Sequence, residues 1–350
     1  MTCSTTCTPQ KTAATKVSDL PSEPSASQDE PGQALEQHIL GEARVFTAAE
    51  IAADTGVDLE KARRLWRALG FPEHGAAKAF TQSDAQALST LVGLVDSGLI
   101  DFDLAVHLTR AVGQTMARLS DWEVSALLTR VLELAREQSG ADDERLAIGL
   151  RMIEEFSEPF EALLLYVWRR HLAAAVVRMP VSPAADGREC LVVGVADVIG
   201  FTRATRRRST AELAGMIERF GSSTTEVIAE GRGRIVKTIG DEVLFVAHTV
   251  GDGAAIALAL QDRVRTEPAL PPLRIGLAVG SVLVRDGDVY GEVVNTAAHL
   301  TGHARPDTVL VDREAAEALA VDARFALRPL RPVAVPDDRR LYPWVLERAT

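Results

Sequence analysis

The chain has 350 residues, of which 47% are hydrophobic and 25% are charged, and its formal net charge is −11. This is the composition of an ordinary globular protein, and the length suggests about two domains. The acidic balance argues against a general nucleic-acid-binding protein, because contacts with phosphate groups require a basic face.

Cysteine usage and the distribution of apolar residues indicate the compartment. Cys3 and Cys7 lie in a polar tail and Cys190 opens a strand, so the three cysteines form no disulfide framework and favour a reducing cytosol. The N-terminus has no apolar signal-peptide core. The most apolar stretch, residues 160–177, is too short and too charged for a membrane span. The sequence therefore predicts a cytoplasmic protein without a membrane-spanning segment.

Residues 1–40 differ in composition from the rest of the chain. They are rich in Ser, Thr, Pro, Gln and acidic residues and contain almost no large apolar ones. Such a segment cannot bury enough surface to offset the entropy lost on ordering, so we predict a disordered tail.

Residues 41–141 have apolar residues at three- and four-residue spacing, which predicts an all-α bundle. Thr47 and Glu50 form a capping box, Gly56 ends the first helix, and Asp58 starts the next. Each further helix begins at Thr or Asp, and these helices are predicted at 81–96, 101–118 and 121–138.

The helical pair at residues 46–70 resembles the helix-turn-helix of MerR-type regulators. Its second helix carries Lys61, Arg63, Arg64 and Arg67. The resemblance implies DNA binding. The alternative is a small helical packing module, which the acidic surroundings favour because phosphate contacts need a basic face.

Residues 142–188 are predicted to form a long switch or linker helix, to about residue 179, and a linker with Pro180, Pro183 and Gly187. Apolar residues line one side of the helix, from Phe156 to Trp168. Such a stripe is usually core, and it also suits a helix that docks between two domains.

Residues 189–350 alternate between strand and helix patterns. Strands are predicted at 191–196, 234–237, 243–247, 273–284 and 308–311, and helices at 209–230, 252–265, 293–304 and 313–319. The order β-α-β-β-α-β is ferredoxin-like, so the chain is predicted to be an α+β protein with an all-α bundle in front.

Two aspartates in this domain stand in matching contexts. Asp197 lies at the end of a predicted strand, and Asp241 lies in the turn of the predicted hairpin, each close to a Gly. An Asp at such a place is commonly a cap or a turn residue. Two of them on neighbouring strands are instead typical of a site for two Mg²⁺ or Mn²⁺ ions that hold a triphosphate and activate an oxygen nucleophile. Gly200, shortly after Asp197, lets backbone N–H groups face phosphates.

Three blocks, residues 195–202, 237–242 and 288–295, together resemble the catalytic domain of class III nucleotide cyclases. In that family the active site forms at a head-to-tail homodimer interface. The resemblance implies that one subunit holds two Mg²⁺ or Mn²⁺ ions with Asp197, Asp241 and Val198. It also implies a phosphate-binding segment, which comprises Gly200, Phe201 and Thr202.

The resemblance assigns nucleotide recognition to the other subunit. Lys237 and Asp288 match the pair that reads adenine, and Asn295 matches the residue that orients the ribose. A donor and an acceptor at these places suit the N1 and 6-amino edge of adenine. Arg331 stands where the family often carries a triphosphate-binding Lys, although Pro332 replaces the Gly that follows it.

His299 is a departure from the family pattern, which has Arg four residues after the Asn. That Arg faces the charge that develops on the α-phosphate, and losing one such donor typically costs about 10²–10³ in rate. Three outcomes stay open. The enzyme is slow, it is slow but faster in acid because a protonated imidazole gains a charge, or Arg305 or His303 acts instead.

The N-terminal half, more loosely, resembles the regulatory domain of the actinobacterial pH-sensing adenylate cyclases. This implies an autoinhibited adenylate cyclase that forms cyclic AMP from ATP, with mild acid relieving inhibition and a fatty acid or other lipid binding the regulatory domain. Two alternatives stay open: a cyclase-like protein that binds nucleotide with weak or no catalysis, favoured by His299, and a DNA-binding regulator that uses residues 46–70.

Overall fold

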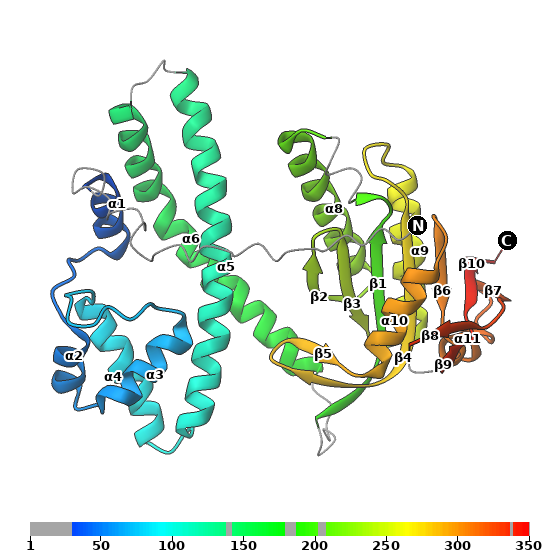
Figure 1. Cartoon of the computed structure of the whole chain (residues 1–350), viewed down its shortest axis with the longest axis horizontal. Helices are drawn as coiled ribbons and strands as arrows, with labels where there is room; N and C mark the ends of the chain where they lie inside the picture. Colours follow the sequence, from blue (N-terminus) through cyan, green and yellow to red (C-terminus); the bar gives the residue numbers. More distant parts are fainter. Residues whose placement is uncertain (1–29, 138–141, 179–186, 202–207, 337–338, 350) are drawn as a thin grey trace, which may run out of the picture. The chain divides into compact units, whose positions relative to one another are not determined.

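The computed structural model describes residues 30–137, 142–178, 187–201, 208–336 and 339–349 (Figure 1). The chain divides into two compact units, residues 1–174 and 175–350. Cys3, Cys7, Pro180, Pro183 and Thr202 lie outside the described residues, and so does the predicted tail up to residue 29.

The first unit is entirely helical. Its helices are α1 Glu30–Leu40, α2 Ala48–Thr55, α3 Leu59–Leu69, α4 Gln82–Asp96, α5 Phe102–Glu137 and α6 Asp142–Arg178. The predicted capping box is confirmed, because Thr47 accepts from the Glu50 amide and Glu50 accepts from the Thr47 amide. Gly56 ends α2 with a φ of 68°, in the left-handed region that glycine adopts without strain.

Two sequence predictions for this unit are wrong. Residues 30–40 form helix α1 rather than part of a tail, and Leu35 and Ile39 of this helix line an apolar cavity with residues of α5 and α6. The helices predicted at 101–118 and 121–138 are one helix, α5. Residues 119–120 between the two predicted helices contain no Gly or Pro that would end a helix. Asp121 is an exposed residue inside α5 and not a cap.

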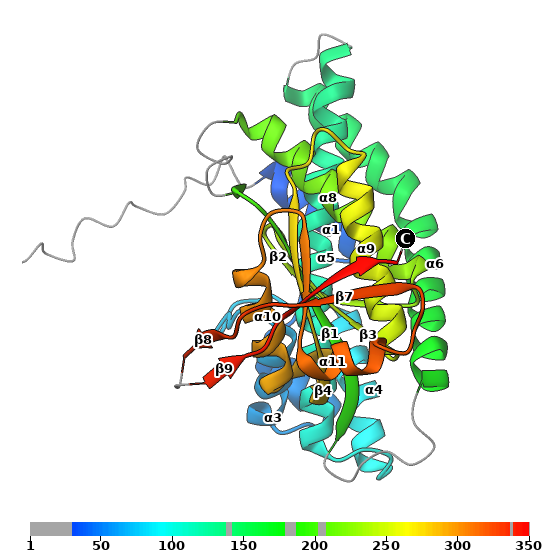
Figure 2. The ribbon, with the colours of Figure 1, turned by 90° about the vertical axis from the view of Figure 1, so that its right-hand side faces the viewer.

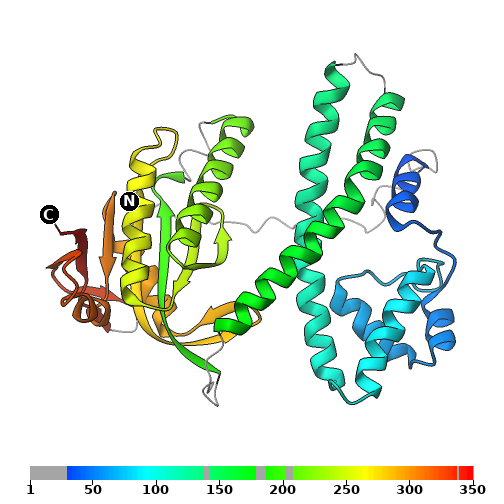
Figure 3. The ribbon, with the colours of Figure 1, turned by 180° about the vertical axis from the view of Figure 1, so that it is seen from behind.

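The first part of α6 lies beside the last part of α5, where a small core includes Val131, Ala135 and Ile148, and α6 then crosses α5 (Figures 1 and 3). Helix α6 agrees with the long helix predicted from residue 142 and contains Pro159. Toward its end, large apolar side chains such as Leu163 and Trp168 are exposed. None of the described helices has both the length and the apolarity that a membrane span requires.

The second unit is an α+β domain, which confirms the predicted fold class. Its helices are α8 Thr210–Glu230, α9 Val250–Arg265, α10 Glu292–His303 and α11 Arg313–Leu319. Its strands are β1 Arg188–Val198, β2 Arg234–Ile239, β3 Glu242–Ala247, β4 Leu273–Arg285, β5 Asp288–Tyr290, β6 Thr308–Val311, β7 Phe325–Pro329, β8 Val333–Val335, β9 Arg339–Leu341 and β10 Trp344–Arg348.

One mixed sheet organises the domain, in the order β2-β3-β1-β4-β6-β10-β7, and β5 pairs with β4. The pairing of β4 with β6 is parallel, while β1 is antiparallel to both β3 and β4. Strands β8 and β9 form a separate hairpin. Strands β1, β2 and β5, the β2–β3 turn and helix α10 carry most of the residues of the candidate site.

Helices cover both faces of the sheet. Alternate residues of β1 point to opposite faces, so Val192 and Ala196 pack with α8, α9 and α11, whereas Val193 and Val195 pack beneath α10. Figures 1 and 2 show α10 on one side of the sheet, and Figure 3 shows α8 and α9 in front of the other. Helix α10 lies close to β4, where a Cβ on Gly276 would meet the backbone of Ala297 and Thr301.

Candidate active site

The β2–β3 hairpin brings Asp241 to the end of β1. Gly240 occupies its tight turn with a φ of 63°, a conformation that glycine tolerates best. The Asp241 carbonyl accepts a 3.1 Å hydrogen bond from the amide of Val198, the residue after Asp197. The two aspartates predicted to bind cations therefore lie side by side, joined through the main chain.

Asp197 is the central member of a row of charged residues across three strands. It pairs with Glu242 on β3 and with Arg274 on β4, so all three side chains point to the face that α10 covers. Asp197 is only 9% exposed. Its Oδ2 accepts a 2.6 Å hydrogen bond from Arg274 Nε. Sequence reasoning missed Arg274, since only strand register brings this residue to Asp197.

The negative charges of Asp197, Asp241 and Glu242 repel one another. Burial, and then the charge and hydrogen bond of Asp197, raise the pKa of Asp241 above its ordinary value. Burial, followed by the charges of Asp197 and Asp241, likewise raises the pKa of Glu242. Concentrated negative charge of this kind is what a divalent cation would neutralise.

The carboxylates of Asp197 and Asp241 suit a hard divalent cation, but they do not complete its coordination. Carboxylate oxygens are the ligands that Mg²⁺ prefers, and one or two suffice where a substrate triphosphate supplies further oxygens. Within the described ranges, no group of three or more His, Cys, Asp or Glu side chains is arranged to hold a metal. Asp197 and Asp241 would thus hold a cation together with the substrate rather than in an all-protein cage.

A second cluster joins Lys237 of β2 to Asp288 of β5. Lys237 Nζ lies 2.6 Å from Asp288 Oδ2, and the side chains are 38% and 24% exposed. Partial burial acts to raise the pKa of Asp288, but the hydrogen bonds from Lys237 and from the Val289 amide outweigh it, so this pKa is lowered. The structure therefore brings together the two residues predicted to read the base.

Asn295 and His299 lie one turn apart on α10. Asn295 is exposed and His299 is half-buried. Among the alternatives weighed for His299, His303 is the last residue of α10 and Arg305 follows it, both exposed. Neither lies within the turn that carries Asn295.

The remaining predicted residues are spread over two loops. Gly200, with a φ of 77°, follows the end of β1, and Phe201 packs against the core beneath α8 and α9. Arg331 is exposed in the segment between β7 and β8. Val198 ends β1 and is buried. No hydrogen bond or ion pair among the described residues joins the Asp197 cluster to the Lys237 cluster.

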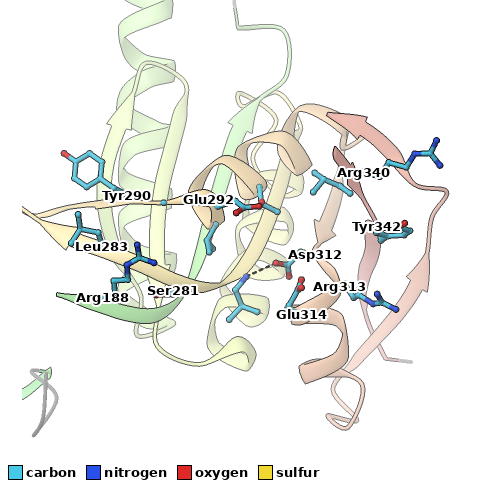
Figure 4. A pocket seen from close by; sticks show the side chains of 15 residues that line it. Arg188, Ser281, Leu283, Tyr290, Glu292, Asp312, Arg313, Glu314, Arg340 and Tyr342 are labelled. Carbon is cyan, nitrogen blue, oxygen red and sulfur yellow. Dashed lines mark hydrogen bonds between the residues drawn. The ribbon is translucent and has the colours of Figure 1, made fainter. Parts of the chain in front are cut away.

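The cavity drawn in Figure 4, of about 900 Å³, is not this site. It lies beside the later part of β4, between the first turns of α10 and α11 and the β8–β9 hairpin, and none of the predicted site residues lines it. Asp312 caps α11 there and accepts hydrogen bonds from the Val279 and Ala315 amides. Burial raises the pKa of Asp312 to about 6.

The basic side chains of α3, which the helix-turn-helix resemblance would assign to DNA, each contact another residue of the same unit. Arg63 pairs with Glu60, Arg64 with Asp103, and Arg67 with Glu73. Lys61 lies over the ring of Phe102. These contacts favour the packing module over DNA binding, because the cations are already engaged within the unit.

Comparison with known proteins assigns both halves of the chain. Residues 184–348 match the adenylate and guanylate cyclase catalytic domain, and residues 26–148 match the adenylate cyclase regulatory domain. An adenylate cyclase of Streptomyces coelicolor is 41% identical over 306 residues, which cover 85% of this chain and 79% of the relative. The chain belongs to the class III adenylate cyclase family.

Further relatives of this cyclase span most of its length. An adenylate cyclase of Glutamicibacter nicotianae is 38% identical over 89% of this chain and 81% of the relative. A pH-sensitive adenylate cyclase of Mycobacterium tuberculosis is 29% identical over 81% of this chain and 72% of the relative. The crystal structure of the adenylyl cyclase CyaB from P. aeruginosa aligns with a TM-score of 0.42 and 17% identity, covering 47% of this cyclase and 96% of that chain.

Proposed function

We propose that this cyclase is a cytoplasmic enzyme that converts ATP to 3′,5′-cyclic AMP and pyrophosphate. The observation that carries the proposal is the pair of clusters on one sheet: adjacent carboxylates at Asp197 and Asp241, and the Lys237–Asp288 ion pair. The first suits a cation-bound triphosphate, and the second suits a base with a neighbouring donor and acceptor.

The two clusters are proposed to serve one nucleotide only when two chains meet. The resemblance to class III cyclases, in which the active site forms at a head-to-tail homodimer interface, supports this division. A homodimer with a head-to-tail arrangement would place Asp197 and Asp241 of one subunit opposite Lys237 and Asp288 of its partner. By symmetry it would create two equivalent sites.

Two divalent cations, Mg²⁺ or Mn²⁺, held by Asp197, Asp241 and the Val198 main chain would offset the triphosphate charge and lower the pKa of the attacking 3′-hydroxyl. The protein's own groups position the substrate. Asn295 is proposed to hold the ribose, and the half-buried His299, one turn further along α10, to donate to an α-phosphate oxygen. Gly200 and Phe201, together with Thr202 outside the described residues, are proposed to face the phosphates, with Arg331 as a further cation.

Base selection follows from the charges of the second cluster. Lys237 has only donors and Asp288, as a carboxylate, has only acceptors. Adenine offers an acceptor at N1 and a donor at its 6-amino group, so it can replace each residue's existing partner. Guanine has the opposite polarity at this edge. We therefore propose ATP rather than GTP as the substrate.

The helical unit is proposed to regulate this activity and to bind a fatty acid or another lipid. An apolar cavity of about 320 Å³ lies between α1, α5 and α6, with Arg145 among its lining residues. Such a lining suits an acyl chain. Addition of oleate to the full chain is expected to change the rate of cyclic AMP formation, and Met152→Glu within the cavity is expected to remove that response.

The direct test measures cyclic AMP formation from ATP by the full chain with Mn²⁺, at about pH 5.5 and about pH 8. Product is expected, and Asp197→Asn and Asp241→Asn should each lower the rate by about 10³ or more, because cation-bound carboxylates are lost. A higher rate at the lower pH would support acid relief of inhibition. Activity retained in both variants would contradict the assignment of Asp197 and Asp241 as cation-binding residues.

The second candidate is a cyclase-like protein that binds nucleotide and signals without turnover. His299 at the proposed α-phosphate position favours it, because a neutral imidazole provides one donor and no charge. Tight binding of ATP that depends on Lys237, with no cyclic product over hours, would identify this protein instead.

A further inference from the structure

Asp197 lies between a basic and an acidic side chain on the two neighbouring strands. Arg274 of β4 and Glu242 of β3 occupy the positions directly opposite it. Residues so paired have Cβ atoms about 4.5–5.5 Å apart and point to the same face. The charges closest to the proposed cation site are therefore set by these two residues as well as by the two aspartates.

We propose that Arg274 and Glu242 tune the affinity of the Asp197–Asp241 site for divalent cations in opposite directions. The inference rests on the proposed function, which assigns these aspartates as the cation-binding carboxylates. Arg274 opposes cation binding because its guanidinium already occupies Asp197 Oδ2, at 2.6 Å. Glu242 favours cation binding because it adds negative charge beside both aspartates.

Glu242 acts as a positioning residue and not as a ligand. It is half-buried, and no three carboxylates among the described residues are arranged as a ligand set. Its place opposite Asp197 also leaves it within the electrostatic range of Arg274.

Cation binding tests the inference without turnover, in the presence of a saturating ATP analogue that lacks the 3′-hydroxyl and supplies the remaining oxygen ligands. Titration of the full-length protein and this analogue with Mn²⁺, followed by the paramagnetic resonance of the free ion at fixed pH and ionic strength and corrected for Mn²⁺ bound by the analogue alone, gives the dissociation constant. Glu242→Gln is expected to weaken binding about tenfold, the lower end of what outer residues contribute to metal sites. Arg274→Gln is expected to tighten it by a similar factor.

Two variants serve as controls for these titrations. Glu218→Gln removes the same charge from the exposed surface of α8, and it should leave the constant within about twofold. Glu242→Asp keeps the charge, and it should bind Mn²⁺ more tightly than Glu242→Gln.

Asp197→Asn separates failure of this inference from failure of the proposed function. Its loss of Mn²⁺ binding, with Glu242→Gln or Arg274→Gln equal to the wild type, would overturn the tuning role and leave the carboxylate assignment standing. Retained Mn²⁺ binding in Asp197→Asn would overturn that assignment itself. If Glu242→Gln fails to fold, Arg274→Gln still decides, since unchanged or weaker binding in it contradicts the inference.

Discussion

At the scale of single residues, the site combines side chains that already satisfy one another. Lys237 and Asp288 form an ion pair, and Asp197 accepts a hydrogen bond from Arg274. Because each charge already has a partner, neither cluster presents a bare charge. In the proposed function, each of these bonds is exchanged for one to substrate or cation. Within the described residues His299 forms no hydrogen bond or ion pair, and it is a position where this chain departs from the family pattern.

His299→Arg is expected to raise kcat about tenfold or more, because a guanidinium supplies a permanent charge and a fork of donors at the α-phosphate. Initial rates at saturating ATP measure it. Ala298→Arg, at an exposed neighbouring position on α10, is the matched control and should give no gain. An unchanged or lower kcat in a folded His299→Arg dimer would contradict the placement of His299.

Asp312 provides a pH prediction. Burial raises its pKa from 3.8 to about 6, assisted by the charge of Glu314 and opposed by the amides of Ala315 and Val279. Between about pH 4 and pH 6, Asp312 therefore stays protonated in the folded state but is ionised in the unfolded state. The contribution of Asp312 to stability is largest below pH 4 and falls as the pH rises to about 6.

Asp312→Asn removes this titration and serves as the reference. The free energy of unfolding of the wild type, measured relative to the variant, should be about 2 kcal/mol more favourable at pH 4.5 than at pH 7.5. Denaturant melts at the two pH values measure it. A difference that does not change with pH would show that the folded pKa is not raised.

At the scale of elements, the contact of α10 with β4 sets the position of Asn295 and His299. Gly276 lets the helix approach the strand closely, and Thr301 fixes it with a hydrogen bond from its hydroxyl to the Val195 carbonyl. The placement of these two proposed site residues thus depends on a glycine that is not itself a proposed site residue.

Gly276→Ala is expected to lower the free energy of unfolding by about 1–3 kcal/mol, because the new methyl group would press on the backbone of Ala297 and Thr301. It should also lower kcat by shifting α10. Gly221→Ala in α8, where the added methyl group meets open space, should be neutral or stabilising by about 0.5–1 kcal/mol. Equal effects of the two substitutions on stability and on kcat would contradict this argument.

The sequence predicted most elements because their signals are local. Capping residues such as Thr47 and Ser209 mark helix starts, and the continuous β-rich run at residues 191–196 marks a buried strand. The continuity of α5 was missed because Asp121 resembled a cap. Arg274 was missed because its partner Asp197 is 77 residues away in the chain, and only register joins them.

At the scale of the whole molecule, a shared active site predicts complementation. Asp197→Asn and Asn295→Ala homodimers should each be inactive, whereas a mixture that exchanges subunits forms heterodimers with one intact site. Random pairing should restore about a quarter of the wild-type activity. No recovery, in a mixture shown to contain heterodimers, would contradict the head-to-tail arrangement.

The separation of the Asp197 cluster from the Lys237 cluster also determines how output depends on the amount of enzyme. If each reaction needs one cluster from each of two chains, dilution below the dissociation constant of the dimer separates dimers into single chains, and a single chain has no complete site. Cyclic AMP production per chain would then fall on dilution, and the total rate would grow as the square of the protein concentration. A modest change in expression would be amplified in the signal before any effector acts.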